Sequence, residues 1–314
     1  MTISFRPAVR ENVGLLIGLA GGTGSGKTFS AMRLAQGIAG DKPFALIDTE
    51  ARRGLHYADR FKFDHAELNP PFRPAAYTEA ILAAEKAGYP VIVIDSFSHE
   101  HAGEGGLLDW HEEELNRMAG DDWKRREAVK MAAWIKPKTQ HKAMVQRLLQ
   151  VRCHLIFCFR AEEKVEMIRE DGKTKIVPKK SRIGLDGWIP ICEKNLPFEL
   201  TCSFLLTADK PGVPQPIKLQ EQHRDLFPAG EPITEAAGQR LATWARGGSV
   251  AKPAAPTTTG KTTLDRAREN AAHGVEAYKT FFGSLTNDER KQIAGHHDQL
   301  KADAAAVDAA AEAA

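Results

Sequence analysis

The sequence predicts an α/β fold in which helices flank a mostly parallel sheet, with a small helical appendage near the C-terminal end. Short apolar runs alternate with helical stretches from the start of the chain, which is the pattern of a parallel sheet covered by helices. A glycine-rich turn joins the first apolar run to the first helical stretch. At 314 residues and 42% hydrophobic composition, the chain can bury one large core and a smaller one.

The individual elements follow from the apolar pattern. The run 13–20 predicts a buried first strand, and the stretch 29–40 predicts the helix after it. Residues 164–167 and 174–177 alternate like the strands of a hairpin, joined through 170–173 around an Asp-Gly turn. Further strands are expected at 44–47, 91–94, 154–159 and 200–206, and further helices at 75–86 and 235–245.

The turn at residues 21–28 reads Gly-Gly-Thr-Gly-Ser-Gly-Lys-Thr, the phosphate-binding pattern G-x-x-x-x-G-K-T between a strand and a helix. Its glycines let backbone N–H groups close around phosphate oxygens, and the helix behind them adds a positive dipole. We expect Lys27 to reach the β- and γ-phosphates of ATP and the Thr28 hydroxyl to bind Mg²⁺. The alternative is a glycine-rich turn that binds nothing. The residues expected to bind the nucleotide are Gly21, Gly22, Thr23, Gly24, Ser25, Gly26, Lys27, Thr28 and Phe29.

A second signal of a nucleotide site is the apolar run 91–94, which closes on Asp95 like the metal-binding strand of such sites. Asp95 is therefore expected to share the Mg²⁺ ion with Thr28. The next residue is Ser96, so no glutamate beside Asp95 can activate water, and a hydrolytic base must come from elsewhere.

Glu50 is the candidate for that base. It lies just past the strand 44–47, at the edge where parallel sheets bind their ligands. A carboxylate in this place can accept a proton from an attacking water molecule. The alternative is a surface acid that pairs with Arg52 or Arg53.

The motifs Gly-Gly-Thr-Gly-Ser-Gly-Lys-Thr, Ile-Asp-Thr-Glu and Val-Ile-Val-Ile-Asp-Ser together resemble the core of RecA-like recombinases. More closely, residues 13 to about 246 resemble the RecA-like AAA ATPases encoded by bacteriophages and prophages, some of which act as single-strand annealing or recombination proteins. The match includes Trp-Ile-Lys-Pro at 134–137 and Phe-Glu-Leu at 198–200. The resemblance implies a RecA-like P-loop NTPase fold, Glu50 as catalytic base, and a homo-oligomer that acts on single-stranded DNA.

One position departs from that family. A glutamine commonly ends the strand after the acidic one and senses the γ-phosphate, and Arg160 stands at the equivalent place here. An arginine can stabilise transition-state charge directly, or reach across a subunit interface as a finger. A salt bridge to Glu162 or Glu163 is a third possibility, and the sequence leaves all three open. No glycine-rich DNA-binding loop of the recombinase kind is evident, so strand exchange is not predicted.

The segment 122–147 is a candidate DNA contact, because it carries eight basic residues against two acidic ones, interleaved with tryptophans. Basic side chains can follow phosphates while aromatic faces stack bases. A solvated helix face beside a core tryptophan explains the same residues. Lys179 and Lys180, beyond the hairpin, are expected to contact DNA or, by analogy with RecA-like filaments, a neighbour's γ-phosphate. The main DNA-binding candidates are Trp123, Lys124, Arg125, Trp134, Lys136 and Lys138.

Residues 1–246 are expected to form the ATPase domain, and residues 247–263, rich in Gly, Ser, Pro, Thr and Ala, a flexible linker. The linker contains Gly-Lys-Thr at 260–262, but no strand precedes it and the motif's first glycine is missing. Residues 264–303 are expected to form a helical pair, which either docks a replication or recombination partner or packs as a tail. The alanine-rich end, 304–314, is predicted to be disordered.

Composition limits the remaining possibilities. The net charge is only +2, so any DNA affinity must come from local patches. No apolar run approaches the ~18 residues of a membrane helix, and the first residues lack the apolar core of a signal peptide. A cytoplasmic protein is therefore expected, in the bacterial host if the gene belongs to a phage. His99, His101 and His111, with glutamates beside them, are interpreted as loop histidines rather than a metal site.

The predicted function is Mg²⁺-dependent binding and hydrolysis of ATP by a protein that acts on single-stranded DNA in phage recombination or replication. A helicase loader or packaging accessory, in which ATP only switches conformation, is the first alternative. A small-molecule P-loop kinase is the second, although neither a lid arginine cluster nor an acceptor motif is evident. The predicted catalytic residues are Lys27, Glu50, Asp95 and Arg160.

Overall fold

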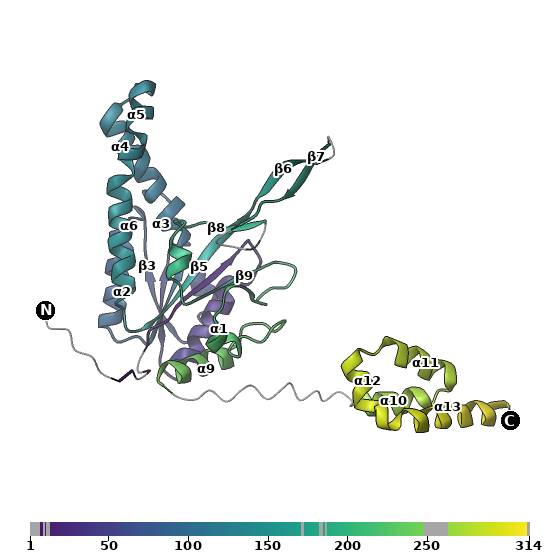
Figure 1. Ribbon diagram of the computed structural model, residues 1–314. Coiled ribbons are helices and arrows are strands. Elements are labelled where there is room, and N and C mark those ends of the chain that lie inside the picture. Colours follow the sequence, from purple (N-terminus) through teal and green to yellow (C-terminus); the bar gives the residue numbers. More distant parts are fainter. Residues whose placement is uncertain are drawn as a thin grey trace. The chain divides into compact units, whose positions relative to one another are not determined.

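The computed structural model describes residues 7–8, 10, 13–170, 173–181, 185, 187–247 and 263–312. The chain divides into two compact units, Met1–Lys252 and Pro253–Ala314. The first unit contains a sheet covered by helices, and the described part of the second is helical (Figure 1). Each unit has hydrophobic core residues of its own.

The main sheet of the first unit confirms the predicted α/β class. Its strands are β1 (Leu16–Gly21), β2 (Phe44–Asp48), β3 (Phe63–Glu67), β4 (Val91–Asp95), β5 (His154–Glu163), β8 (Trp188–Pro190), β9 (Cys202–Leu206) and β10 (Gln215–Lys218). They lie in the order β10-β9-β1-β5-β4-β2-β3, and β8 pairs with β5. Among the described strands of this sheet, β8 and β10 are antiparallel to their neighbours and the others pair in parallel. The sheet is therefore mostly parallel.

Side chains on the two faces of this sheet enter separate cores, because successive residues of a strand point to opposite faces. In β4, Val93 packs in one core and its neighbour Ile94 packs in the other. Burial on both faces explains why these strands read as continuous apolar runs. The first face is covered by α1 (Lys27–Ala39) and α9 (Glu235–Ala245), and the second by α2 (Pro74–Lys86) and α6 (Ile135–Leu148).

Some element boundaries differ from the sequence expectations. The strand β3 is not among the predicted ones, because its residues are mostly exposed or half-buried at the sheet edge and form no apolar run. The strand β5 continues four residues past the predicted 154–159, and β9 begins at Cys202 rather than at residue 200. These shifts do not change which strand ends meet at the edge of the sheet.

Two segments extend away from the sheet (Figure 1). The first, here named the helical arm, comprises α4 (Leu107–Ala119), α5 (Trp123–Ala133) and the start of α6 up to Lys138. The second is the predicted hairpin, formed by β6 (Val165–Glu170) and β7 (Lys173–Pro178) in antiparallel register. Its Asp-Gly turn at 171–172 lies outside the described residues. The remaining short elements of this unit are α3 (Ser98–Ala102), α7 (Leu196–Glu199), α8 (Glu221–Arg224) and the 3₁₀ helix η1 (Arg53–Tyr57).

The second unit corrects two expectations. In place of a helical pair, its described residues form four α-helices and the 3₁₀ helix η2 (Ala294–His296). In place of a disordered tail from residue 304, the last helix continues to Glu312. Alanine is the strongest helix former, and Leu300 and Ala304 are buried in the core of this unit, so the alanine-rich stretch is helical. The four helices are α10 (Thr263–Ala271), α11 (Val275–Ser284), α12 (Asn287–Ile293) and α13 (His297–Glu312).

A side chain of the last helix also fixes the start of α11. The carboxylate of Asp308 accepts a hydrogen bond from the Val275 backbone N–H at 3.0 Å. Of the predicted linker, residues 248–262 lie outside the described part of the chain. Within the described part, we find no helix that has both the length and the apolar character needed to cross a membrane.

Candidate active site

The phosphate-binding loop is a tight turn between β1 and α1. Gly24 and Gly26 have φ angles of 75° and 79°, in the left-handed region that favours glycine. A Cβ atom at Gly21 would lie 2.4 Å from the Leu206 carbonyl oxygen of β9, so a larger residue does not fit there. The glycines therefore allow both the sharp turn and the close packing of the loop against the sheet.

Two polar side chains hold the start of this loop. The Nζ of Lys27 donates to the Gly22 carbonyl oxygen at 2.9 Å, and the Oγ of Ser25 donates to the same oxygen at 2.8 Å. The side chain of Lys27 therefore folds back into the turn, although Lys27 is the first residue of α1.

The two predicted metal ligands lie next to each other. The Oγ1 of Thr28, at the start of α1, donates to the Oδ2 of Asp95, at the end of β4, at 2.5 Å. Burial raises the pKa of Asp95 to about 6, and the hydrogen bond from Thr28 opposes that rise. A hydroxyl and a carboxylate are hard oxygen donors, which fit Mg²⁺ when nucleotide phosphates supply further ligands. The described residues contain no group of three or more His, Cys, Asp or Glu side chains that could hold a metal by themselves.

One cavity brings the four predicted catalytic residues together. Its volume is about 690 Å³, within the range of small-molecule sites. The whole phosphate-binding loop forms one side, and Glu50, Asp95 and Arg160 also line it. Three residues of η1 also line it without having been predicted, namely Arg53, His56 and Tyr57.

Phe29, the last of the predicted nucleotide contacts, lines the cavity but also packs in an aromatic cluster. Its ring centroid lies 6.0 Å from that of Tyr57 and 5.4 Å from that of Phe61. The cluster connects the first turn of α1 to η1, so it supports the wall of the cavity that the sequence did not predict. The position of η1 directly after Glu50 in the chain is the signal that could have found this wall.

Asp48 shapes the turn that carries Glu50. Its buried carboxylate accepts hydrogen bonds from the backbone N–H of Glu50 at 2.7 Å and of Gly54 at 2.9 Å. The Nε2 of His65 on β3 lies 3.2 Å from the same carboxylate. These bonds hold the chain after β2 in a fixed turn, and Glu50 projects from that turn into the cavity.

Arg160 pairs with Glu50. Its Nε and Nη2 atoms donate to the Oε1 of Glu50 at 3.0 and 2.7 Å. The Nη1 of Arg53 donates to the Oε2 of Glu50 at 3.2 Å. This is the pairing expected if Glu50 is a surface acid rather than a base. The salt bridge of Arg160 is thus with Glu50, whereas Glu162 pairs with Lys164 at 2.7 Å. The predicted base and the predicted arginine therefore form one unit, although 110 residues separate them.

A family model described as an AAA domain matches residues 14–188, more than half of the chain. The chain belongs to this family. The family consists of P-loop AAA-type ATPases. The matched range includes the phosphate-binding loop, Glu50, Asp95 and Arg160. No curated protein matches the chain.

Three of the DNA-binding candidates of this AAA domain protein lie together at one end of α5. Trp123 is 72% exposed, and the side chains of Lys124 and Arg125 beside it are exposed as well. The carboxylate of Asp122 caps the helix by accepting the backbone N–H groups of Lys124 and Arg125. The cap leaves the two basic side chains exposed, and the Nζ of Lys124 lies 5.7 Å from the Trp123 ring centroid within the same turn.

The other three candidates have partners inside the helical arm. The ring of Trp134 stacks on His111 with a centroid distance of 4.2 Å, and the Nζ of Lys138 lies 5.4 Å from the Trp134 ring centroid. The Nζ of Lys136 pairs with Glu114 at 3.1 Å. These contacts match the alternative of a helix face beside a packed tryptophan. The structure thus divides the predicted DNA-binding group in two.

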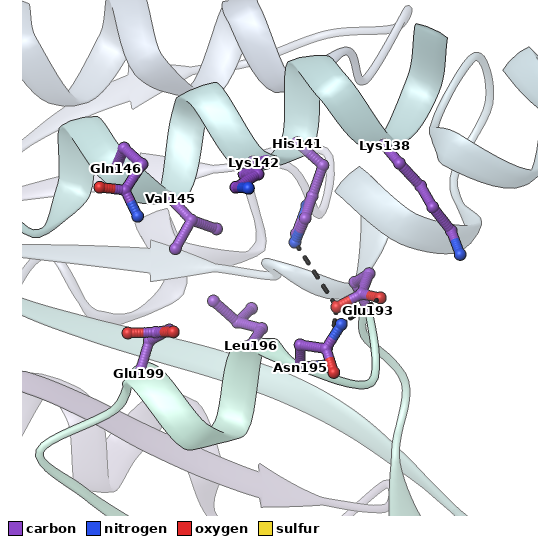
Figure 2. A pocket seen from close by; sticks show the side chains of 9 residues that line it. All are labelled: Lys138, His141, Lys142, Val145, Gln146, Glu193, Asn195, Leu196 and Glu199. Carbon is purple, nitrogen blue, oxygen red and sulfur yellow. Dashed lines mark hydrogen bonds and ion pairs between the residues drawn. The ribbon is translucent and has the colours of Figure 1, made fainter. Parts of the chain in front are cut away.

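Lys138 also lines a second cavity, of about 340 Å³, of which Trp123 is not a lining residue (Figure 2). Lys138 and Lys142 on α6 face Glu193 and Glu199 on the opposite wall. Between the walls, the Nε2 of the buried His141 lies 3.8 Å from the Oε2 of Glu193. A polyanion that met these lysines would also meet the glutamates, so this surface does not favour DNA.

Proposed function

We propose that this AAA domain protein binds ATP with Mg²⁺, hydrolyses it, and uses the cycle to act on single-stranded DNA in phage recombination or replication. The observation that carries the catalytic part is the single cavity in which the phosphate-binding loop, the Thr28–Asp95 pair and Glu50 meet. The resemblance to phage-encoded RecA-like ATPases supports the biological setting.

In the proposed reaction, the loop amides and Lys27 bind the phosphates and orient the γ-phosphate for attack. Thr28 and Asp95 would hold Mg²⁺, which would supply positive charge to neutralise the charge developing on the phosphate oxygens. Glu50 takes a proton from the attacking water, so that the water oxygen forms its bond to phosphorus as the bond to the leaving ADP breaks.

Arg160 has two acceptors available in this scheme. In the structure it donates to Glu50, which occupies lone pairs that a general base needs. A guanidinium is also the group best suited to the planar array of phosphate oxygens in the transition state. We therefore propose that Arg160 moves from Glu50 to the γ-phosphate when ATP binds. This movement would free the base and stabilise transition-state charge with one residue.

The DNA part of the proposal is supported by the exposed end of α5. Trp123 offers an aromatic face for stacking, and Lys124 and Arg125 offer charges for phosphates, the combination that single-strand binding uses. A homo-oligomer would repeat this contact along a strand. Exposed apolar residues of the hairpin, Val165, Met167 and Ile176, are suited to contacts between copies.

A loader or accessory role is the second candidate, and the C-terminal unit is the observation that favours it. This unit has its own core, formed around Tyr278, Phe281 and Leu300. A separately folded helical unit is suited to docking a protein partner of the replication or recombination machinery.

ATP hydrolysis measured with and without single-stranded DNA tests the first proposal. We expect DNA to raise kcat, and we expect the increase to be weaker for double-stranded DNA of the same sequence. A hydrolysis rate that single-stranded DNA leaves unchanged would remove the DNA part of the proposal. In that case, deletion of the C-terminal unit and a test for protein partners would address the loader role.

A further inference from the structure

His99 lies beside the proposed catalytic base without lining the nucleotide cavity. It belongs to the short helix α3, just past the end of β4, and its side chain is 14% exposed. Its Nδ1 lies 2.7 Å from the Oγ1 of Thr49, and its Nε2 lies 4.0 Å from the Oε1 of Glu50. The ring stacks on Phe72 with a centroid distance of 4.9 Å, which fixes the plane in which the two nitrogens lie.

The contacts of Thr49 determine which nitrogen of His99 carries the proton. The Oγ1 of Thr49 accepts from the Ser96 backbone N–H at 2.8 Å and donates to the Ser96 carbonyl oxygen at 3.0 Å. A hydroxyl group has only one proton to donate. The Thr49 hydroxyl gives its proton to the Ser96 carbonyl oxygen. The contact between Thr49 Oγ1 and His99 is then a hydrogen bond only if the Nδ1 of His99 is the donor.

The other ring nitrogen then faces Glu50. Burial, and next the charge of Arg160, lower the pKa of His99, so the imidazole is neutral near neutral pH. A neutral ring that is protonated on Nδ1 has a lone pair on Nε2. Three groups thus surround the Glu50 carboxylate, namely the donors Arg160 and Arg53 and the acceptor nitrogen of His99.

We propose that His99 is a positioning residue for Glu50, whose Nε2 lone pair accepts the hydrogen bond of the Glu50 carboxyl group after that group has taken a proton from the attacking water. This inference rests on the proposed role of Glu50 as the base. The proton passes from the water to the carboxylate, and the new O–H bond points at Nε2 without breaking. A small side-chain rotation closes the 4.0 Å separation to hydrogen-bond distance.

Two conservative variants separate this role from a purely structural one. Asparagine places its amide near the position of Nδ1 and retains the link to Thr49, whereas glutamine places its amide near Nε2 and retains a partner for Glu50. If His99 positions Glu50, His99→Asn lowers kcat by about 10-fold to 100-fold with little change in KM for ATP, and His99→Gln keeps most of the activity. If His99 only holds Thr49 and Ser96 in place, His99→Asn keeps most of the activity and His99→Gln loses it.

His101→Gln is the matched control. His101 is a partly buried histidine on the same helix, and it forms no hydrogen bond or ion pair with Glu50 in the described part of the chain. Its kcat should equal that of the unmodified protein, and thermal unfolding should show all variants folded. In a Glu50→Gln background, His99→Asn should have no further effect on kcat, since the two residues act as a unit.

The outcomes distinguish the two proposals. If Glu50→Gln hydrolyses ATP normally, the base assignment and the role of His99 are both wrong. If Glu50→Gln is inactive but His99→Asn is as active as the unmodified protein, Glu50 stays the base and the positioning role of His99 alone is overturned.

Discussion

The cavity proposed to bind nucleotide and the helical arm differ in how their functional side chains are held. In the cavity, side chains from separate elements bind each other, as the pairs Thr28–Asp95 and Arg160–Glu50 do. At the exposed end of the arm, Trp123, Lys124 and Arg125 share a single helical turn that projects into solvent. The side chains of the cavity thus hold one another in place, whereas those at the end of the arm have no hydrogen-bond, ion-pair or ring partners from other elements among the described residues.

The sheet is the reason for this difference. Parallel strands that end at one edge bring their following residues together, whatever the chain does in between. A basic helical segment carries no such constraint, because the face that each residue occupies decides whether it packs or stays free. Trp134 therefore stacks on His111 and Lys136 pairs with Glu114 inside the arm, whereas Trp123 is exposed. Substitutions in the cavity should accordingly have large, residue-specific effects, and those in the arm should have smaller effects that depend on whether the side chain is paired within the arm.

The largest effect is expected for Glu50→Gln. The amide still forms hydrogen bonds but accepts no proton, so kcat for ATP hydrolysis should fall about 10²-fold to 10⁴-fold while ATP binding is retained. Rapid-quench measurement of hydrolysis and equilibrium binding of a labelled nucleotide together check this. Loss of nucleotide binding in the variant would instead mean that Glu50 is mainly structural, through its pairs with Arg160 and Arg53.

Lys27→Ala should have the next largest effect. Removing one preorganised charge that faces the phosphates lowers the hydrolysis rate by about 10²-fold to 10³-fold. The variant also lacks the hydrogen bond from Lys27 to Gly22, so nucleotide affinity should fall with the rate. Lys42→Ala, at an exposed lysine just after the same helix, is the control and should behave like the unmodified protein. Equal rates in the two variants would place the phosphate site elsewhere.

Several features of the fold and of the cavity could be predicted from the sequence because they depend on local pattern. The runs before Asp48 and Asp95 are buried on both faces, which leaves no ambiguity about where these strands end. The phosphate-binding loop needs glycine at defined positions, and its spacing is visible in the sequence. The strand β3 cannot be predicted in this way, because an edge strand with polar residues has neither a continuous apolar run nor a glycine motif.

Other features depend on distances that no local pattern contains. The sequence places Arg160 and Glu50 at the same sheet edge, but it also offers Glu162 and Glu163 as nearer partners. The structure shows Glu162 paired with Lys164, which leaves Arg160 to Glu50. Likewise, the sequence predicts His99 in a loop, whereas it lies in α3, and its contact with Thr49 depends on the register between β2 and β4.

A third prediction compares the two tryptophans of the arm. Trp123→Ala should weaken single-stranded DNA binding by about 1–3 kcal/mol for each base it stacks, without changing stability. Trp134→Ala should lower the free energy of unfolding by about 0.5–3 kcal/mol, because its ring stacks on His111, and leave the affinity of the folded protein for DNA unchanged. Denaturant unfolding and fluorescence anisotropy measure the two quantities. Reversed results would mean that DNA binds along the packed side of the arm.

The smallest expected effect is on the salt dependence of DNA binding. If Lys124 and Arg125 bind phosphates, replacing both by glutamine should reduce the log–log slope of affinity against salt by about 0.7 for each charge that had neutralised a phosphate. The matched pair is Lys136→Gln with Lys138→Gln, which removes the same charge from the packed side, where Lys136 already neutralises Glu114. That pair should leave the slope unchanged, because no bound counterions are released there on DNA binding. If both pairs reduce the slope equally, pairing within the arm does not decide which residues bind DNA. If neither does, the arm is an ordinary solvated surface, and the lysines that follow the hairpin, Lys179 and Lys180, become the next residues to test.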